Sequence, residues 1–242
     1  IISAKHLLNQ RFGNDSNQLN KQFYEELLHI IGLEEVKSKG KKVIQRLGEE
    51  KRNYGSLLES VIFTLEEKEY LRKVPKIREY GQNKNEQVFN IALELCLTWI
   101  NRILFIKLLE SQLLNYHDGN KNYRFVHQDF IEGFDDLEAL FFSALAKKHS
   151  ERNPRYKEKY QYIPYLNSSL FEPNELEEKV MQISNVKNEN LTFHSRTILK
   201  DTHNKTLKGE KNTLAYLFDF LNAYDFGSDD KNKIEEAEQS KT

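Results

Sequence analysis

The first residues whose types could do chemistry are Asp15 and the triplet Glu35-Val36-Lys37. An aspartate followed by Glu-x-Lys is the set with which a metal-dependent nuclease holds Mg²⁺, provided that the carboxylates lie on adjacent strands. No strand pattern precedes Glu35, because the residues before it have helical spacing. The same spelling recurs at Glu66-Glu67-Lys68 and Glu177-Glu178-Lys179, as expected where 30% of residues are charged. We therefore interpret the triplet as a chance match.

A second candidate is the tetrapeptide Asn153-Pro154-Arg155-Tyr156, which resembles the Asn-Pro-Pro-Tyr turn of adenine-N6 methyltransferases. In that chemistry the asparagine accepts hydrogen bonds from the amino group of a flipped adenine, and the aromatic ring stacks on the base. Such a turn follows a buried apolar strand, whereas the residues before Asn153 read Ala-Lys-Lys-His-Ser-Glu-Arg. We therefore interpret the tetrapeptide as a charged loop between helices and assign no catalytic residue.

The remaining patterns predict neither a cofactor nor a metal in this chain. No Gly-x-Gly occurs, whereas a methyltransferase needs a glycine-rich turn close to its cofactor. The single cysteine, Cys96, excludes a disulfide within the chain and a Cys-based zinc site, and it fits a reducing cytoplasm. No two histidines lie four residues apart or at zinc spacing; they are His6, His29, His117, His127, His149, His194 and His203.

Two basic runs predict contacts with nucleic acid. The first spans Lys37 to Arg52 and could neutralise several phosphates, although glutamates flank it. The second spans Lys147 to Lys159. The alternative is that both are solvated loops, as most charge runs are. The residues expected to contact nucleic acid are Lys37, Lys39, Lys41, Lys42, Arg46, Lys51, Arg52, Arg155 and Lys157.

The composition predicts a mainly α fold with little or no β structure. Only four Pro and ten Gly occur in 242 residues, and a scarcity of chain breakers favours long helices. Hydrophobic residues make up 38% of the chain, so a core can form beneath a heavily solvated surface. A formal net charge of −1 gives the whole chain no bias towards nucleic acid or membrane. Polar residues interrupt the most apolar stretch, residues 88–114, so no membrane span is predicted.

The hydrophobic periodicity predicts an irregular multi-helix domain around one long central helix. This helix runs from Glu86 to Asn115 and is apolar on most sides, as expected of a helix that others pack around. Ser56 is expected to cap another helix, with Glu59 at the capping-box position. Further helices are expected at residues 20–31, 56–65, 135–145, 175–183 and 213–224, with a loop or mobile hairpin at 37–53 and a short strand near 192–198.

A proline-bounded segment, Tyr162–Pro173, lies between two charged helical regions. Pro164 and Pro173 restrict the backbone, and the Asn-Ser-Ser centre favours a tight turn. The segment is therefore expected to be an ordered, non-helical crossing. Its apolar side chains are expected to be buried against the helices; they are Tyr165, Leu166, Leu170 and Phe171.

The ends of the chain predict a piece of something longer. The first residue is Ile1 and the only methionine is Met181, whereas a natural reading frame would start with Met. Residues 1–226 are expected to form one helical connector domain. Residues 227–242 are acidic, polar and almost free of apolar side chains, so they are expected to form a linker or tail.

The order of five segments resembles the helical region that precedes the methyltransferase core of type IIG restriction–modification enzymes. Arg102 to Glu110 matches an Arg-x-Leu-Phe-x-Lys-x-Leu-Glu helix of that family, and Tyr162–Pro173 matches its Pro-Tyr-Leu-Asn-Gly-Gly-Leu-Phe-Glu segment, with Ser168 and Ser169 where Gly-Gly is commoner. The other similar segments are residues 19–28, 134–142 and 217–226.

The resemblance implies a non-catalytic helical connector that positions two catalytic domains and touches the DNA backbone. The parent is expected to bind DNA and to methylate adenine N6 with S-adenosylmethionine, whereas cleavage with Mg²⁺ is left open. The implied partners are DNA and the adjacent methyltransferase and nuclease domains, in a bacterial cytoplasm and without a membrane. The alternative is a helical protein–protein interaction adaptor with no enzymatic parent.

Overall fold

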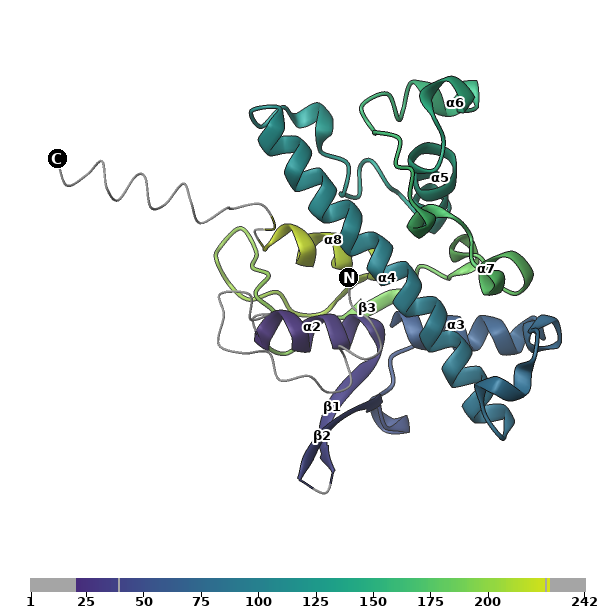
Figure 1. Ribbon diagram of the computed structural model, residues 1–242. Helices are drawn as coiled ribbons and strands as arrows, with labels where there is room; N and C mark the ends of the chain where they lie inside the picture. Colours follow the sequence, from purple (N-terminus) through teal and green to yellow (C-terminus); the bar gives the residue numbers. More distant parts are fainter. Residues whose placement is uncertain (1–20, 39, 225, 227–242) are drawn as a thin grey trace.

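The computed structural model describes residues 21–38, 40–224 and 226, and this part of the chain is mainly α, as predicted. Its helices are α2 (Lys21–Ile31), α3 (Leu57–Glu67), α4 (Lys84–Tyr116), α5 (Phe134–Ala139), α6 (Pro154–Lys157), α7 (Glu175–Lys179) and α8 (Thr213–Asn222). Two antiparallel hairpins complete it: β1 (Leu33–Ser38) with β2 (Lys41–Arg46), and β3 (Asn190–Thr192) with β4 (Glu210–Asn212). In Figure 1, α4 crosses the molecule diagonally, with α2 and α8 on one side and α5, α6 and α7 on the other.

A hydrophobic core joins helices from both ends of the described chain. Phe23 of α2 stacks on Phe220 of α8 with ring centroids 4.8 Å apart. Leu58 of α3 and Ile91 of α4 are completely buried in the same core. Because these residues lie far apart in sequence, burial of apolar surface, rather than local helix propensity, holds the helices together.

Helix α4 contains the predicted helix Glu86–Asn115 and has 33 residues. The Asn83 side chain caps it by accepting the backbone N–H of Glu86. The expectation that α4 is apolar all round is too broad. Ile103 and Ile106 are buried, whereas Leu104 is half-buried and Leu108 is 41% exposed. The buried stripe therefore covers one face of α4.

The predicted capping box at the start of α3 is wrong. Ser56 is the N-cap residue, but its side chain makes no capping hydrogen bond. The Glu59 carboxylate is occupied by the Arg46 guanidinium instead, with N–O distances of 2.7 and 2.6 Å. An ionised partner makes a stronger hydrogen bond to a carboxylate than a neutral backbone N–H does, so the ion pair is favoured over the cap.

The two sheets correct the sequence analysis. Residues 37–53 were expected to form a loop or mobile hairpin; a hairpin forms, but its first strand begins earlier, at Leu33, directly after the left-handed Gly32 that ends α2. Glu35 therefore lies on a strand, whereas the helical spacing of the residues before it indicated no strand there. The second expected strand is also displaced: β3 ends at Thr192, where the prediction began.

The helix predicted at residues 135–145 begins as α5 and continues as a π-helix over Leu140–Leu145. The crossing Tyr162–Pro173 is ordered and mostly extended, with one 3₁₀ turn at Ser169–Phe171. Phe171 is fully buried, as expected, whereas Tyr165 is exposed and its predicted burial is wrong. The crossing therefore packs on the helices through Phe171 in its second half and also through Ile163 near its start, which is 2% exposed.

Candidate nucleic-acid interface

The β1–β2 hairpin extends away from the helical body and carries three predicted lysines on its outer half (Figure 1). Lys37 faces Lys42 across the two strands, and Ser38 faces Lys41. All three lysines are exposed. Gly40 has a φ of +77°, the left-handed conformation that this tight reversal requires. Strands of this length extend about 20 Å, so the lysines are held clear of the body.

Two of these lysines have no ion-pair partner in the described residues. Lys42 Nζ lies 2.8 Å from the Glu35 carboxylate on the neighbouring strand. Lys37 and Lys41 make no such pair within the described ranges. Like charges that face each other across strands repel, and Glu35 reduces that repulsion at Lys42. The predicted Lys39 lies outside the described residues.

The arginines at the base of the hairpin fasten it to the body. Arg46 binds the buried Glu59 of α3 with two hydrogen bonds, which also raise the pKa of the arginine. Arg52 is half-buried and donates to a backbone carbonyl at 3.0 Å. Lys51 lies 4.0 Å from Glu34. Arg46 and Arg52 therefore have structural contacts within the chain, and their contact with nucleic acid stays a prediction.

The second basic run lies at the opposite end of the molecule. Arg155 and Lys157 are exposed on α6, far from the β1–β2 hairpin in Figure 1. Lys159 is paired with Asp136 at 2.6 Å. The structure therefore does not combine the two predicted basic runs into one surface.

Arg152, in the middle of the second run, is a buried structural residue. It is 2% exposed and donates to the backbone carbonyls of Lys147, Tyr160 and Ile163 at 3.2, 2.7 and 2.8 Å. Burial lowers the pKa of this guanidinium. Its hydrogen bonds close the charged loop onto the start of the crossing, so the run contributes fewer surface cations than its sequence suggests.

The Asn153-Pro154-Arg155-Tyr156 tetrapeptide starts α6. The Asn153 side chain accepts the backbone N–H of Arg155 at 3.0 Å, and Pro154 occupies the first helical turn. This is the usual use of an Asn-Pro pair at a helix N-terminus. Asn153 is exposed, and its side-chain oxygen is already used by its own helix. The geometry agrees with an interhelical surface segment.

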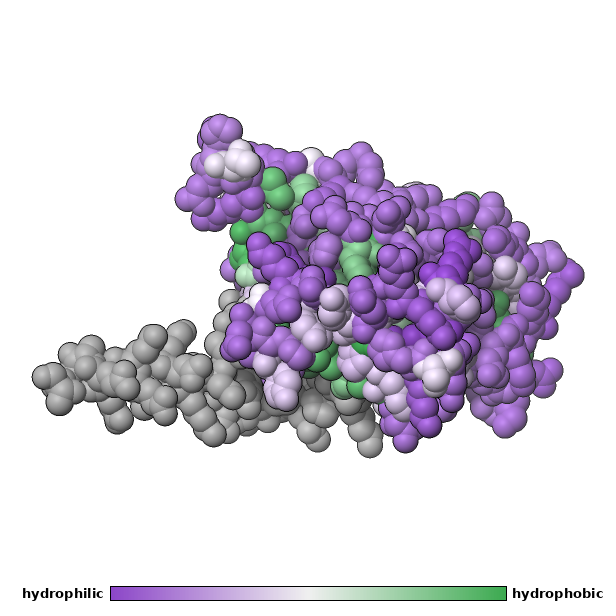
Figure 2. All heavy atoms as spheres, turned by 90° about the horizontal axis from the view of Figure 1, so that it is seen from above, coloured by the Kyte–Doolittle hydropathy of each residue, from purple (hydrophilic) through white to green (hydrophobic). Residues whose placement is uncertain are grey.

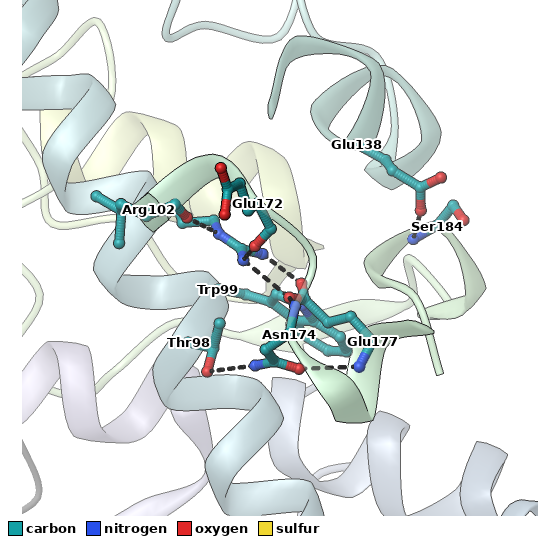
Figure 3. A network of polar contacts seen from close by, with 9 residues as sticks. Thr98, Trp99, Arg102, Glu138, Glu172, Asn174, Glu177 and Ser184 are labelled. Atoms are coloured by element: carbon teal, nitrogen blue, oxygen red, sulfur yellow. Dashed lines mark hydrogen bonds and ion pairs between the residues drawn. The ribbon is translucent and has the colours of Figure 1, made fainter. Parts of the chain in front are cut away.

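A buried ion pair joins α4 to α7 and to the crossing (Figure 3). The Arg102 guanidinium binds both carboxylate oxygens of Glu177, one of them at 2.8 Å. It also donates to the carbonyls of Leu170 and Glu172 at 2.5 and 2.9 Å. Trp99 Nε1 donates to Glu177 at 2.9 Å. These four hydrogen bonds of Arg102 hold both the crossing and α7 against α4.

A second buried pair lies further along α4. Lys107 Nζ binds Glu110 and the Asn222 side chain of α8, both at 2.7 Å. Glu110 also accepts the backbone N–H groups of Phe125 and Val126 at 2.6 and 2.5 Å. This network ties α4 to α8 and to the loop after the α4 turn.

A third cluster surrounds Glu26 of α2, which is fully buried. Its Oε1 accepts hydrogen bonds from the hydroxyls of Tyr216, at 2.7 Å, and Thr197. Within the described part of the chain, its Oε2 has no hydrogen-bond partner, and the same holds for Nδ1 of His194. Burial raises the pKa of Tyr216, which keeps that hydroxyl protonated as a donor. The cluster links both ends of the described chain.

Sequence reasoning did not find these networks. Arg102, Lys107 and Glu110 stood out only as interruptions of an apolar stretch and as parts of a family-like helix, and Glu26 was not singled out. The signal was available: an ionisable residue on the buried side of a hydrophobic helix must have a partner, because an unpaired buried charge is very costly. The identity of the partner was not available, since Glu177 lies 75 residues from Arg102.

The described residues offer no group of three His, Cys, Asp or Glu side chains that could hold a metal. The triplet Glu35-Val36-Lys37 lies on β1, but Glu35 is paired with Lys42 there, and the predicted third member, Asp15, lies outside the described residues. An open hollow of about 420 Å³ lies between α2 and the segment Ser195–Thr197, with mixed polar walls. Among the described residues, no helix combines the length and apolarity required to cross a membrane.

A family model described as Domain of unknown function (DUF7814) matches residues 16–242. No curated protein and no solved structure matches the chain significantly. The match covers all the residues that form the hairpin and the three buried networks, so these features are parts of the family domain.

Proposed function

We propose that this chain, which belongs to the DUF7814 family, is a non-catalytic helical connector that positions DNA for a restriction–modification enzyme. The parent would be a bacterial, cytoplasmic enzyme that methylates adenine N6 with S-adenosylmethionine. If the parent also cleaves DNA, a Mg²⁺-dependent nuclease would be one of its further domains. Within the connector, α4 would be the central helix that fixes the distance between the flanking catalytic domains.

The buried networks support the connector role. The segments that carry the resemblance to type IIG enzymes contact one another through them: Arg102 of α4 holds the crossing, and Lys107 of α4 holds α8 through Asn222. Helix α8 is the last helix described before the carboxyl end. A force on α8 would therefore reach the crossing through one continuous helix, which is what a rigid spacer requires.

The β1–β2 hairpin is the observation that carries the DNA contact. A two-stranded β-ribbon fits the major groove of B-DNA, and this one presents Lys37, Lys41 and Lys42 on its exposed outer half. Lysines act on phosphates as point charges without reading base sequence. We therefore expect the hairpin to contribute affinity and register, and the flanking domains to contribute specificity.

A titration of labelled duplex DNA at several salt concentrations tests this contact. The variant carries Lys37→Ala, Lys41→Ala and Lys42→Ala together. Loss of up to three phosphate contacts should reduce the slope of log K against log [salt] by about 2–3. Lys200→Ala, Lys205→Ala and Lys208→Ala together form the matched control, since these lysines are exposed on another loop.

The control variant should leave the slope within about half a unit of that of the parent chain. If both triple variants change the slope equally, the hairpin is not a specific contact and this proposal is wrong. Incorporation of labelled methyl groups into DNA by the chain alone would also contradict the non-catalytic role.

A specific surface favours the second candidate, a protein–protein interaction adaptor. Tyr54 is 67% exposed and Phe63 is 44% exposed, and both line a hollow of about 220 Å³. Lys187 lies over the Phe63 ring at 4.3 Å. Exposed aromatic residues of this kind are typical anchors of protein interfaces. The adaptor would be favoured if a protein partner binds the chain and Tyr54→Ala abolishes this binding. The chain itself should then have no affinity for DNA.

A further inference from the structure

A row of four aromatic rings lies where α4 ends and the crossing begins. Tyr116 packs edge-on against His117 with centroids 5.0 Å apart. His117 stacks on Tyr123 at 3.7 Å, with the ring planes 3° apart. Tyr123 then meets Tyr162 edge-on at 5.4 Å. These residues are called the aromatic row below.

The local backbone explains why the rings meet. Helix α4 ends at Tyr116, and Asp118 and Gly119 follow in the left-handed conformation, with φ of 52° and 75°. The Asn120 side chain then accepts the N–H of Asn122 and starts a 3₁₀ turn. This reversal returns Tyr123 onto His117, so the rings are held in place before any ligand binds. Preorganisation of this kind lowers the entropic cost of binding.

The outer ring of the row is open to solvent. Tyr116 is 82% exposed and Tyr162 is 39% exposed, whereas Phe125, two residues after Tyr123, is fully buried. Packing in the hydrophobic core therefore does not explain why an aromatic residue stands at Tyr116. Seen from above, the surface of the molecule is mostly hydrophilic with small hydrophobic patches (Figure 2). The residues next to the row in the sequence are exposed and polar, among them Asp118, Asn120 and Lys121. The row is thus a set of aromatic faces in polar surroundings rather than part of a large apolar patch.

The charge beside the row is positive. Lys121 and Arg124 are exposed and make no ion pair within the described part of the chain. Between Tyr116 and Arg124, the sequence contains a single carboxylate, Asp118. Stacking rings next to free cations are the combination that binds nucleic acid strands whose bases are unpaired, since any base offers a π face and each phosphate a negative charge.

We propose that the aromatic row binds an unpaired nucleotide, with Tyr116 stacking on the base and Lys121 and Arg124 neutralising the adjacent phosphates. This goes beyond the proposed function, in which the hairpin contacts the backbone of a duplex. It does not depend on the hairpin, which lies at the other end of the molecule (Figure 1). Double-stranded DNA hides its base faces by stacking, so the site distinguishes single-stranded from duplex DNA.

The test measures anisotropy with a labelled oligothymidylate of about 12 nucleotides, within the range of known site sizes, and with an abasic strand of equal length and charge. The chain should bind the oligothymidylate more tightly. Tyr116→Ala should weaken that binding about 5- to 100-fold and remove the preference over the abasic strand. Tyr116→Phe should retain it, because the phenyl ring still stacks.

The matched control is Tyr165→Ala, which removes an exposed tyrosine outside the aromatic row and should leave the affinity unchanged. Thermal unfolding of Tyr116→Ala should match that of the parent chain, because this side chain is mostly exposed. The triple lysine variant of the hairpin should keep its preference for bases, so the two proposals fail separately. Equal affinity for both strands, or a Tyr116→Ala affinity within about twofold of the parent, would overturn the aromatic row as a nucleotide site.

Discussion

Arg102 shows how one side chain fixes three segments of this chain. Its guanidinium satisfies Glu177 of α7 and two carbonyls of the crossing at the same time. Both charged groups are almost fully buried, at 2% and 1% exposure. Each buried charge has lost its hydration and is compensated by its partner. The pair therefore supports stability only while both partners are present.

Removal of one partner should therefore destabilise the protein more than removal of both. Arg102→Ala should lower the free energy of unfolding by about 3–5 kcal/mol, because Glu177 is left buried and uncompensated. The double change Arg102→Met with Glu177→Met should cost clearly less. Urea unfolding measures both, with Arg72→Ala as a control at an exposed pair with Glu69. An Arg102→Ala effect within about 0.5 kcal/mol of that control would contradict the buried-pair account.

His194 should make stability depend on pH. Burial, assisted by the nearby His29, lowers the pKa of His194 below its usual 6.5. The unfolded chain therefore binds this proton more readily than the folded chain, and stability falls as pH drops below about 6.5. The urea midpoint should decrease between pH 7.5 and 5.5, and His194→Gln should reduce that decrease. The exposed His203→Gln is the control; if it has the same effect, His194 is not the cause.

Residue-level prediction from the sequence succeeded for the exposure of the hairpin lysines and failed for the arginines, whose partners it did not find. The lysines at 37, 41 and 42 are exposed, as a charge run predicts. Arg46, Arg52 and Arg152 belong to the same runs, yet they bind acceptors that folding brings near. Composition shows how many charges a segment has, but tertiary contacts decide which of them remain at the surface.

At the scale of elements, α4 has a buried face and an exposed face. Ile103 is completely buried, whereas Leu108 protrudes from the same helix. Ile103→Ala should reduce stability by about 2–5 kcal/mol, as large-to-small changes in a core do. Leu108→Ala should change it by less than about 1 kcal/mol. Equal effects in thermal or urea unfolding would show that α4 is buried on both faces.

The β1–β2 hairpin should be held to the body mainly by Arg46. Only two strands pair there, and an isolated two-stranded hairpin is marginal in water. Arg46→Ala removes the bidentate contact with Glu59 and leaves that carboxylate buried. Amide exchange of the Val36–Val43 pair should accelerate more than that of α4. Lys42→Ala, which removes only an exposed ion pair, is the control and should have little effect.

Helices were predictable from the sequence to a degree that strands were not. The periodicity located α2, α4 and α8 within a few residues, because a buried face repeats along a helix. The strand Leu33–Ser38 has only one completely buried residue, Leu33, so it lacks the alternation that would have revealed it. The π-helix at Leu140–Leu145 depends on packing against Phe171 and Arg102, which no local pattern contains.

At the scale of the whole molecule, the two basic runs predicted to contact nucleic acid lie at two ends. The hairpin lysines are at one end, and Arg155 and Lys157 of α6 are at the other (Figure 1). A single short duplex segment bound to one end leaves the other end free. A longer duplex that runs along the molecule would reach both, as the proposed role of a spacer between two catalytic domains would require.

This separation predicts independent contributions to DNA affinity. Sites that share no partner and lie far apart contribute additively in free energy. Arg155→Ala with Lys157→Ala should therefore weaken binding of a long duplex by the same factor in the parent chain and in the triple lysine variant of the hairpin. A duplex too short to reach both ends should respond to the changes at the end that it binds, and the changes at the other end should add no further effect. Affinity measured by anisotropy at fixed salt tests this with two duplex lengths. Strong coupling between the two sets on the short duplex would mean that both bind the same segment, which the positions of α6 and the hairpin do not allow.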